Sequence, residues 1–534
     1  MFDNEIRLVP KPLKTSPDIK VAWCFPHDYS IGMSGLGFQL IYHLLDSAPD
    51  VDVTRVFKDV EEQGANQCEL FGFTVSWELD FINILAMLKA HGIDWLSKDR
   101  DDNAPLVFGG GPVLSANPET YADIFDVILL GDAEETIPVL LNAVRESKAL
   151  NSRLKRLEHL ASCPGIYVPS LYSFEYESPL GPISSVKTLS SCAPSHVSKL
   201  LFRAKENYIA HSIILSPDTT WGDTFLLEIV RSCPQECRFC LASYLTRPFR
   251  TAPVSTILEK VDMAREHTNR FGLMGPSITE HPEFDSILDG LLERDQLSVT
   301  VASVRADTLT TKLASSLRAL GQKSVTIALE SGSERLRRIM KKNLTEPEIL
   351  AAVDAIESGG MSGVKFYGIA GLPYETMDDV NETIRLMTQL KRAHKKLKFV
   401  FGVSSFVPKA QTPYQWKGRD PESKKKTEHL RKNLAKIGID IRPESHNWSD
   451  IQGLLSRGDR RLTPVLLSVA SAGESLGAWR KALRDFEDSV PSLDYYAYRD
   501  IESDEILPWA HLANEEKSPY LARQMAEATL ESTR

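Results

Sequence analysis

The sequence predicts an α/β protein in three parts: an N-terminal doubly wound, Rossmann-like domain, a central partial (β/α)6 barrel and a helical C-terminal region. Short apolar segments alternate with helix-period segments over residues 1–150 and again from about 223 to 416. Such alternation predicts parallel strands joined by helices. The 534 residues also exceed the size at which a single hydrophobic core stops growing, about 250–300 residues. We therefore expect more than one domain.

In residues 1–150 the expected strands end in glycine-rich or polar turns. The apolar runs are Ile19–Phe25, Val51–Phe57, Glu69–Val75, Pro105–Phe108 and Val127–Leu130. Ligands of a doubly wound sheet bind beyond the carboxyl ends of its strands. We therefore expect ligands to bind at the turns that follow Phe25, Val75, Phe108 and Leu130.

Residues 151–222 form a connector with several serines and prolines, and the second alternation fills residues 223–416. Its strand candidates are Phe225–Val230, Arg270–Met274, Ser298–Ser303, Ser324–Leu329, Gly363–Ile369 and Phe399–Phe406. Six strand–helix units predict a partial barrel whose site lies at the C-terminal ends of the strands. Residues 417–534 are charged and expected to be helical.

Composition and charge limit the cellular locations and the classes of binding partner that we expect. There is no run of 18 apolar residues, and the N-terminus lacks the basic stretch and apolar core of a secretory signal, so we expect neither a membrane partner nor export. We interpret Cys24, Cys68, Cys163 and Cys192 as free thiols of a cytoplasmic protein. A net charge of −10 does not indicate nucleic-acid binding, which is usually basic.

The strongest chemical signal is the segment Arg231–Cys240, directly after the first barrel strand. It places Cys233, Cys237 and Cys240 in a C-x3-C-x2-C spacing. Three thiolates on one loop can bind three irons of a cubane cluster and leave the fourth iron open to another ligand. A zinc knuckle is the alternative, although structural zinc sites normally have four protein ligands.

The ends of later barrel strands supply further candidate binding residues. Gly275 and Pro276 follow the second strand, where glycine allows close backbone approach; an ordinary turn is the alternative. Ser303 and Arg305 are two residues apart, so on a strand both would face the barrel interior, where arginine can pair with a carboxylate. The alternative is an arginine exposed at the strand end.

Two more motifs follow in order. Glu330 ends an otherwise apolar strand, where a carboxylate is costly to bury without a partner, so it is a candidate for holding a cationic or hydroxyl-rich ligand. Gly368 and Gly371 lie in the segment Gly368–Pro373 at the end of the next strand. Each motif alone is weak, but their order along the barrel is informative.

Together these motifs resemble those of radical S-adenosylmethionine (radical SAM) enzymes, including an aromatic Phe239 before the third cysteine. The segments around Glu330 and Gly368–Pro373 are similar to the fifth- and sixth-strand motifs of the family. The chain departs from the family at Gly272–Ile278, where a Gly-Gly-Glu type motif is usual. The resemblance implies a 4Fe-4S cluster on Cys233, Cys237 and Cys240, and an electron donor such as flavodoxin or ferredoxin. It also implies S-adenosyl-L-methionine contacts at Phe239, Gly275, Pro276, Ser303, Arg305, Glu330, Gly368 and Gly371.

The N-terminal domain resembles the cobalamin-binding module that precedes some radical SAM barrels. The matching segments are Phe73–Trp77, Gly109–Pro112 with Asn117–Glu119, and Gly131–Glu135. The resemblance implies cobalamin contacts at Ser76, Gly109, Gly110, Gly111 and Gly131. The D-x-H-x-x-G motif is absent, so any cobalamin would bind without the usual axial histidine. The alternative is a Rossmann-like domain that binds no cobalamin.

The resemblance covers nearly the whole chain and implies cobalamin-dependent methyl transfer to an unactivated carbon of an unknown substrate, started by a 5′-deoxyadenosyl radical. The alternatives are a radical rearrangement without cobalamin, a non-enzymatic iron–sulfur or cobalamin-binding regulator, and a methylthiotransferase acting on tRNA or a ribosomal protein. The last would need a second cluster on Cys24, Cys68 and Cys163. The arginine-rich Ser456–Arg461 has no assigned chemistry; it could bind an anionic substrate or cap a surface helix.

Overall fold

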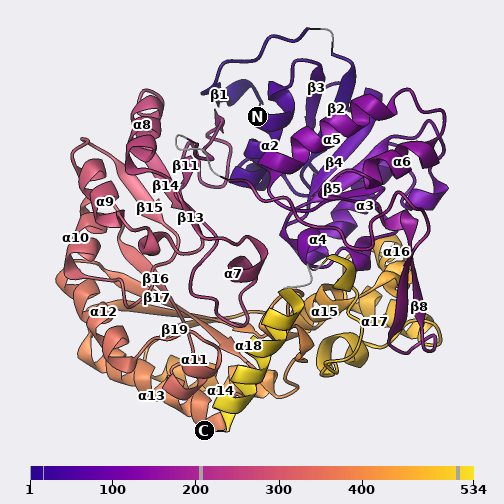
Figure 1. Cartoon of the computed structure of the whole chain (residues 1–534). Helices are drawn as coiled ribbons and strands as arrows, with labels where there is room; N and C mark the ends of the chain where they lie inside the picture. The colour runs from indigo at the N-terminus through magenta and orange to yellow at the C-terminus, as the bar shows by residue number, and fades with distance from the viewer. Residues whose placement is uncertain (1, 16, 204–207, 513–516, 534) are drawn as a thin grey trace.

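The computed structural model describes residues 2–15, 17–203, 208–512 and 517–533. The N-terminal domain and the barrel form two α/β bodies, and the yellow C-terminal helices lie against both (Figure 1). Among the described helices, none is both long enough and apolar enough to cross a membrane.

The N-terminal domain is a six-stranded sheet in the order β3-β2-β4-β5-β6-β7. All pairs are parallel except β6 with β7. Its strands are β2 (Ile19–Cys24), β3 (Val51–Val56), β4 (Leu70–Thr74), β5 (Leu106–Gly110), β6 (Val127–Leu129) and β7 (Ile166–Tyr167). Its helices are α1 (Tyr29–Gly32), α2 (Leu36–Ser47), α3 (Phe81–Ala90), α4 (Pro112–Ala116), α5 (Ala133–Ser147) and α6 (Arg153–Ala161). The predicted doubly wound fold is confirmed, and the sheet continues past residue 150 into the expected connector.

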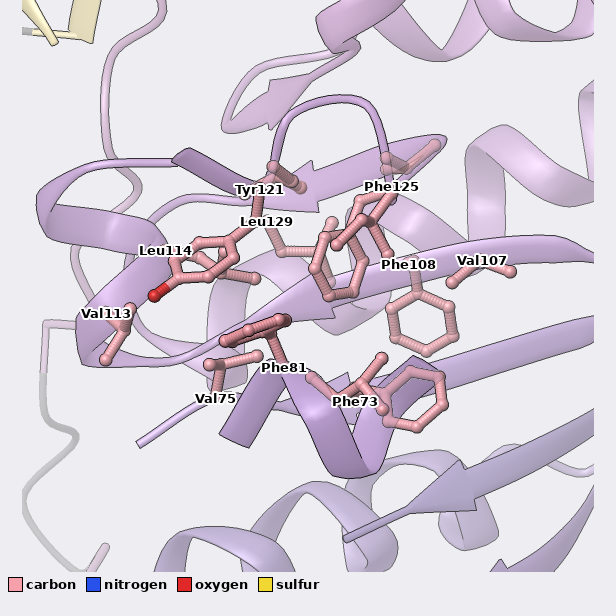
Figure 2. Packing of buried hydrophobic residues seen from close by; sticks show 14 of the residues in the cluster. Phe73, Val75, Phe81, Val107, Phe108, Val113, Leu114, Tyr121, Phe125 and Leu129 are labelled. Atoms are coloured by element: carbon pink, nitrogen blue, oxygen red, sulfur yellow. The ribbon is translucent and has the colours of Figure 1, made fainter. Parts of the chain in front are cut away.

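The inner strands of this sheet are mostly apolar because helices cover both of its faces. Every residue of β4 is buried, for example. Figure 2 shows part of the core, in which Phe73 and Phe125 meet edge to face with ring centroids 6.4 Å apart, and Phe81 packs against Tyr121 at 6.1 Å. Strand order reverses between β3-β2 and β4-β5, and that reversal creates the crevice where sheets of this kind bind ligands.

The barrel consists of two parallel sheets, β11-β14-β15 and β16-β17-β18-β19, joined by a bridge between Val304 and Ile327. The strands are β11 (Phe225–Glu228), β14 (Arg270–Met274), β15 (Ser298–Val301), β16 (Ser324–Glu330), β17 (Gly363–Ala370), β18 (Lys398–Ser405) and β19 (Asp440–Pro443). The first six match the predicted partial barrel. The seventh, β19, carries the sheet past the expected boundary at 416.

Helices follow the barrel strands as expected for βα units. They are α7 (Leu241–Leu245), α8 (Val254–Ala264), α9 (Phe284–Leu292), α10 (Thr311–Ala319), α11 (Glu334–Ile339), α12 (Glu346–Ser358), α13 (Met377–Ala393) and α14 (Ser423–Lys436). Residues at the helix N-termini explain where α12 and α13 begin: Thr345 and Thr376 each form a capping box with the acidic residue three positions later.

Shorter elements connect the two bodies. In the connector, β8 (Tyr172–Tyr176) and β9 (Ile183–Thr188) form an antiparallel pair, and β10 (Ile214–Leu215) pairs with β1 (Ile6–Arg7). Beyond β19 the chain is helical, as predicted: α15 (His446–Arg457), α16 (Thr463–Ala472), α17 (Leu476–Asp485) and α18 (Lys517–Ser532). Of these, α16 packs on α3 of the N-terminal domain and α18 on α11 of the barrel.

Candidate functional site

The three clustered cysteines lie in a loop at the C-terminal edge of the barrel. The loop leaves β12 (Val230–Arg231), ends at α7, and its base is closed by antiparallel pairing of β12 with β13 (Arg250–Thr251). Two residues of the loop have left-handed backbones, Ser232 (φ 69°) and Glu236 (φ 54°), and the amide of Cys240 donates to the carbonyl of Cys237 at 2.9 Å. Non-glycine residues with positive φ persist only where the surroundings hold them, so this loop shape is imposed by its contacts.

The thiols of this loop are close enough for their charges to interact. Burial raises the pKa of Cys237 to about 12, and Cys240 and Cys233 act in the same direction while Lys342 opposes them. Within the described residues, no three histidine, cysteine, aspartate or glutamate side chains form a group arranged to hold a metal ion. That finding concerns a single ion, because a cubane cluster takes each cysteine on a different iron.

A buried ion pair lies beside the thiols. Glu330, at the end of β16, meets Lys342 with 3.5 Å between carboxylate Oε1 and Nζ, and both residues are less than 10% exposed. Burial raises the pKa of Glu330, while Lys342 opposes that shift. Although burial acts to lower the pKa of Lys342, Glu330 and the neighbouring cysteines raise it. The predicted need of Glu330 for a partner is thus met by a lysine that the sequence had not indicated.

The backbone at Glu330 is unusual as well. Its φ is +65°, and the pairing of β16 with β17 shifts register between Ala328 and Glu330. A bulge at the end of a barrel strand redirects the side chain that follows it. The strain at Glu330 therefore accompanies a carboxylate placed beside the cluster loop, as is common at functional sites.

Arg305 also reaches this region. It is 8% exposed and pairs with Asp307 at 2.7 Å and with Glu280 at 3.4 Å. Glu280 in turn accepts a hydrogen bond of 2.5 Å from Nε2 of Gln235 in the cluster loop. Arg305 is thus buried and not exposed at a strand end. Ser303 is half-buried. It lies outside β15, because that strand ends at Val301, two residues before the predicted end at Ser303.

The predicted glycines of the barrel are placed at tight contacts. Gly275 has φ 149°, and a Cβ there would lie 2.6 Å from the carbonyl oxygen of Val230 in β12. Pro276 beside it is exposed. A Cβ on Gly368 would lie 2.5 Å from the ring of Phe401. Gly275 therefore lets the second strand approach the stem of the cluster loop, which explains the glycine without any ligand.

Gly371 and Phe239 belong to the same edge of the barrel. Gly371 has φ 78°, and its amide donates to Oε2 of Glu375 at 2.6 Å. Glu375 is paired with Lys426 at 3.3 Å, and burial raises its pKa to about 7. Phe239, half-buried, packs on the apolar cluster that contains Leu336, Leu372 and Phe406. Three of the predicted motifs thus lie close together in space: the cysteine loop, Glu330 and the segment Gly368–Pro373.

A second site lies in the N-terminal domain at the reversal of strand order. A cavity of about 350 Å³ opens beyond the ends of β2 and β4. It is lined by Phe25, Ile31, Ser34, Gly35, Gly37, Phe38, Thr74, Ser76, Thr220 and Trp221. Ile31 and Trp221 are each more than 40% exposed, so the cavity has an apolar rim. Of the residues predicted in this domain, Ser76 lines it.

The glycines predicted to contact a cofactor in this domain instead make room for protein. A Cβ would meet the side chain of Leu114 at Gly109, the side chain and carbonyl of Leu129 at Gly110, and the carbonyl of Val75 at Gly111. At Gly131, with φ 119°, it would lie 2.0 Å from the carbonyl of Leu200 in the connector. None of the four lines the cavity described above. Close packing against protein atoms accounts for the glycines at 109, 111 and 131, whereas a Cβ at Gly110 would lie 3.6 Å from the carbonyl oxygen of Leu129, an ordinary contact.

The acidic residues after Gly131 connect the N-terminal domain to the cluster loop. Asp132 pairs with Arg250 at 2.7 Å and with Arg231 at 3.3 Å, and Glu134 pairs with Arg231 at 2.7 Å. Arg231 and Arg250 face each other in the β12–β13 pairing that closes the loop. The acidic residues of the segment Gly131–Glu135 therefore clamp the base of the loop.

The segment Asn117–Glu119 meets Ser456–Arg461, two motifs that are remote in the sequence. Asn117 donates to the carbonyl of Gly458 at 2.8 Å. Glu119, fully buried, pairs with Arg460 at 2.6 Å. The arginine-rich turn thus docks the C-terminal region on the N-terminal domain, and neither a surface helix cap nor an anion site is needed to account for it.

Comparisons with known proteins agree with this architecture. Residues 227–387 match the family described as Radical SAM superfamily, and residues 60–169 match Radical SAM proteins, N-terminal. The chain is 29% identical over 477 residues to Uncharacterized protein MJ0966 of Methanocaldococcus jannaschii, covering 88% of this chain and 96% of that one. It is 25% identical over 176 residues to the tRNA-2-methylthio-N(6)-dimethylallyladenosine synthase of Thermotoga petrophila, covering 30% and 39% of the two chains.

Two solved structures share the fold. The radical SAM methyltransferase TsrM from Kitasatospora setae, solved with cobalamin and a 4Fe-4S cluster, matches with a TM-score of 0.53 at 12% identity, covering 89% of this chain and 99% of that chain. The cobalamin-dependent radical enzyme OxsB, solved with aqua-cobalamin, matches with a TM-score of 0.50 at 14% identity, covering 88% and 71%. The protein is an enzyme of the radical SAM superfamily in which a Rossmann-like domain precedes the barrel.

Proposed function

We propose that this enzyme binds one 4Fe-4S cluster through Cys233, Cys237 and Cys240 and uses it to cleave S-adenosylmethionine, with cobalamin as carrier of a methyl group destined for an unactivated carbon. The observation that carries the proposal is the convergence of the cysteine loop with Glu330, Lys342 and Arg305 at one edge of the barrel. Such a cluster supplies the electron for the cleavage, and cobalamin supplies a methyl-transfer centre.

The residues present fit this chemistry. The loop offers three thiols and no fourth cysteine, which suits a cluster with one open iron. Beside it are buried groups of both signs, and the ammonium and carboxylate of an amino acid need partners of both signs when they leave water. Lys342 and Arg305 would bind a carboxylate, and Glu330 would bind a cation or a hydroxyl-rich ribose.

The lining of the N-terminal cavity fits the apolar face of a large cofactor. Its lining combines aromatic rings, two glycines at the start of α2 and four hydroxyl side chains, at the position where doubly wound sheets bind ligands. The exposed rim formed by Ile31 and Trp221 would be covered by such a ligand. We therefore assign cobalamin to this cavity and not to the glycines at positions 109, 110, 111 and 131.

The methylthiotransferase alternative loses support. A second cluster would need three more cysteines close together. Cys24 lies close enough to Cys68 for the two thiols to interact. Cys163, however, follows α6, and its thiol donates a hydrogen bond to the carbonyl of His159. The similarity to the tRNA-modifying relatives also covers only part of both chains, 30% of this chain for the Thermotoga protein. A single cluster is the expected outcome.

The experiment is anaerobic purification with cobalamin supplied, followed by iron and sulfide analysis, absorbance spectra and a 5′-deoxyadenosine assay. We expect close to four irons per chain, a corrinoid band and slow 5′-deoxyadenosine formation in the absence of substrate. Cys237→Ala should lose the cluster and the 5′-deoxyadenosine together, whereas Cys192→Ala, at an exposed thiol, should keep both. About eight irons would favour the methylthiotransferase, and 5′-deoxyadenosine formation by the Cys237→Ala chain would contradict the proposal.

A further inference from the structure

The C-terminal helix α18 is joined to the loop that carries the three cysteines. Arg238, between the second and third of them, is only 2% exposed and pairs with Glu531 at 2.7 Å and Glu527 at 3.3 Å. Its guanidinium also donates to the carbonyl of Ile339 at 2.6 Å, at the end of α11. A buried arginine depends on such partners, because an unpaired charge away from water is costly.

A second set of contacts holds the other side of the same loop. Glu236 accepts a hydrogen bond of 2.7 Å from the hydroxyl of Tyr520 in α18. Lys341, which follows α11, pairs with Glu236 at 2.8 Å and donates to Gln524 of α18 at 3.2 Å. The left-handed backbone of Glu236 is thus fixed by groups from two other elements.

The same helix reaches the remaining motifs. Ala528 is fully buried and Met525 partly buried in the apolar cluster that contains Phe239, Leu336, Ile369, Leu372 and Phe406. The hydroxyl groups of Tyr374 and Thr529 lie 2.8 Å apart. One face of α18 therefore touches the cysteine loop, the segment after β16 and the segment after β17. In Figure 1 this yellow helix runs beside α11 at the edge of the barrel.

We propose that α18 positions the cysteine loop: Glu527 and Glu531 hold Arg238, and Tyr520 holds Glu236, so that the three thiols are presented in a fixed arrangement and the two carboxylates tune the cluster. The inference rests on the proposed function for the cluster itself, but the ordering of the loop is a property of the chain without metal. In this proposal the residues of α18 are positioning residues that act through Arg238 and Glu236.

The test compares Glu527→Gln/Glu531→Gln with the wild-type chain. The matched control, Glu487→Gln/Asp488→Asn, removes two exposed carboxylates near α17 and changes the net charge equally. In the metal-free protein we expect amide hydrogen exchange over residues 232–241 to accelerate about tenfold or more in the α18 variant only, because Arg238 is left buried without its carboxylates. In the reconstituted protein the cluster midpoint potential should rise, since removing nearby negative charge favours reduction.

Two further variants separate positioning from general damage. Tyr520→Phe removes a single hydroxyl and should accelerate exchange around Glu236 while the helix stays folded. Arg238→Met in the Glu527→Gln/Glu531→Gln background removes the unpaired charge, so it should recover at least half of the lost protection.

The proposal would be overturned if the α18 variant and the control showed the same loop exchange and the same midpoint potential. A wild-type chain that takes up no iron would contradict the proposed function instead. In that event the exchange of the metal-free loop alone would still decide whether α18 positions it.

Discussion

At the scale of single residues, the candidate site depends on buried charges that satisfy one another. Glu330 and Lys342 lie beside Cys237, and each is nearly excluded from solvent. Neither charge would be stable there alone, because transfer of an isolated ion from water costs more than hydrogen bonds can return. The pair therefore places a carboxylate and an ammonium group where the amino acid end of a ligand could exchange with them.

Removing one member of this pair should cost more than removing both. Glu330→Gln leaves Lys342 buried and unpaired, with an expected loss of about 3–5 kcal/mol in the free energy of unfolding. Glu330→Gln/Lys342→Met should lose clearly less, since no unpaired ion remains. Urea unfolding of the metal-free chains measures both. Equal losses for the single and double variants would show that the two groups do not stabilise each other.

At the scale of elements, the cysteine loop is clamped from outside the barrel at its base as well as along its length. Asp132 and Glu134, at the start of α5, pair with Arg231 and Arg250, which are opposite each other in β12 and β13. The clamp couples the N-terminal domain to the position of the cysteines. A similar clamp is formed by α18 on the far side of the loop.

Breaking the base clamp should loosen the loop stem. Asp132→Asn/Glu134→Gln is expected to lower the free energy of unfolding by about 2–3 kcal/mol, because hydrogen bonds to charged groups contribute about 1.5–3 kcal/mol each and Arg231 keeps Glu228 as a partner. Trypsin should cleave after Arg231 and Arg250 faster than in wild type. Glu135→Gln, the next residue of α5, provides the control, and equal cleavage rates in the two variants would count against the clamp.

At the scale of the whole molecule, one buried polar network joins the N-terminal domain, the connector and the C-terminal region. Glu119 pairs with Arg460, and the hydroxyl of Tyr167 lies between them as donor to Glu119 and acceptor from Arg460. His511 packs on the Tyr167 ring with centroids 4.9 Å apart and reaches Glu119 at 3.5 Å. Segments about 340 residues apart along the chain are thus joined through buried polar contacts.

His511 should make this unit sensitive to acid. Burial, helped by Arg460, lowers its pKa to about 3, against about 6.5 in an unfolded chain. Below pH 6.5 the unfolded state binds a proton that the native state does not, so stability present above pH 6.5 is lost as the pH falls, by up to about 1.4 kcal/mol per pH unit. Chemical unfolding of metal-free His511→Phe between pH 5 and 6.5 should show a smaller slope of stability against pH than wild type. Parallel slopes would refute the assignment.

The sequence by itself determined the class of fold, the cysteine loop and the order of the motifs along the barrel. These are local features: strand–helix alternation, a C-x3-C-x2-C spacing and glycines after strand ends such as Gly275 and Gly371 are visible in short windows of residues. The confirmed elements are accordingly those with strong local patterns.

Only the tertiary structure decided which partners those motifs meet. Lys342 follows a strained turn, so its pairing with Glu330 depends on the packing of α11 and not on sequence spacing. The glycines at 109, 111 and 131 were predicted from the sequence as cofactor contacts, yet a Cβ at each of them would come within 2.7 Å of protein atoms that the fold brings there. The ion pairs that Glu134 and α18 make with the cysteine loop join residues about 100 to 300 positions apart in the sequence. Such contacts arise from burial and charge pairing in three dimensions, which no local pattern encodes.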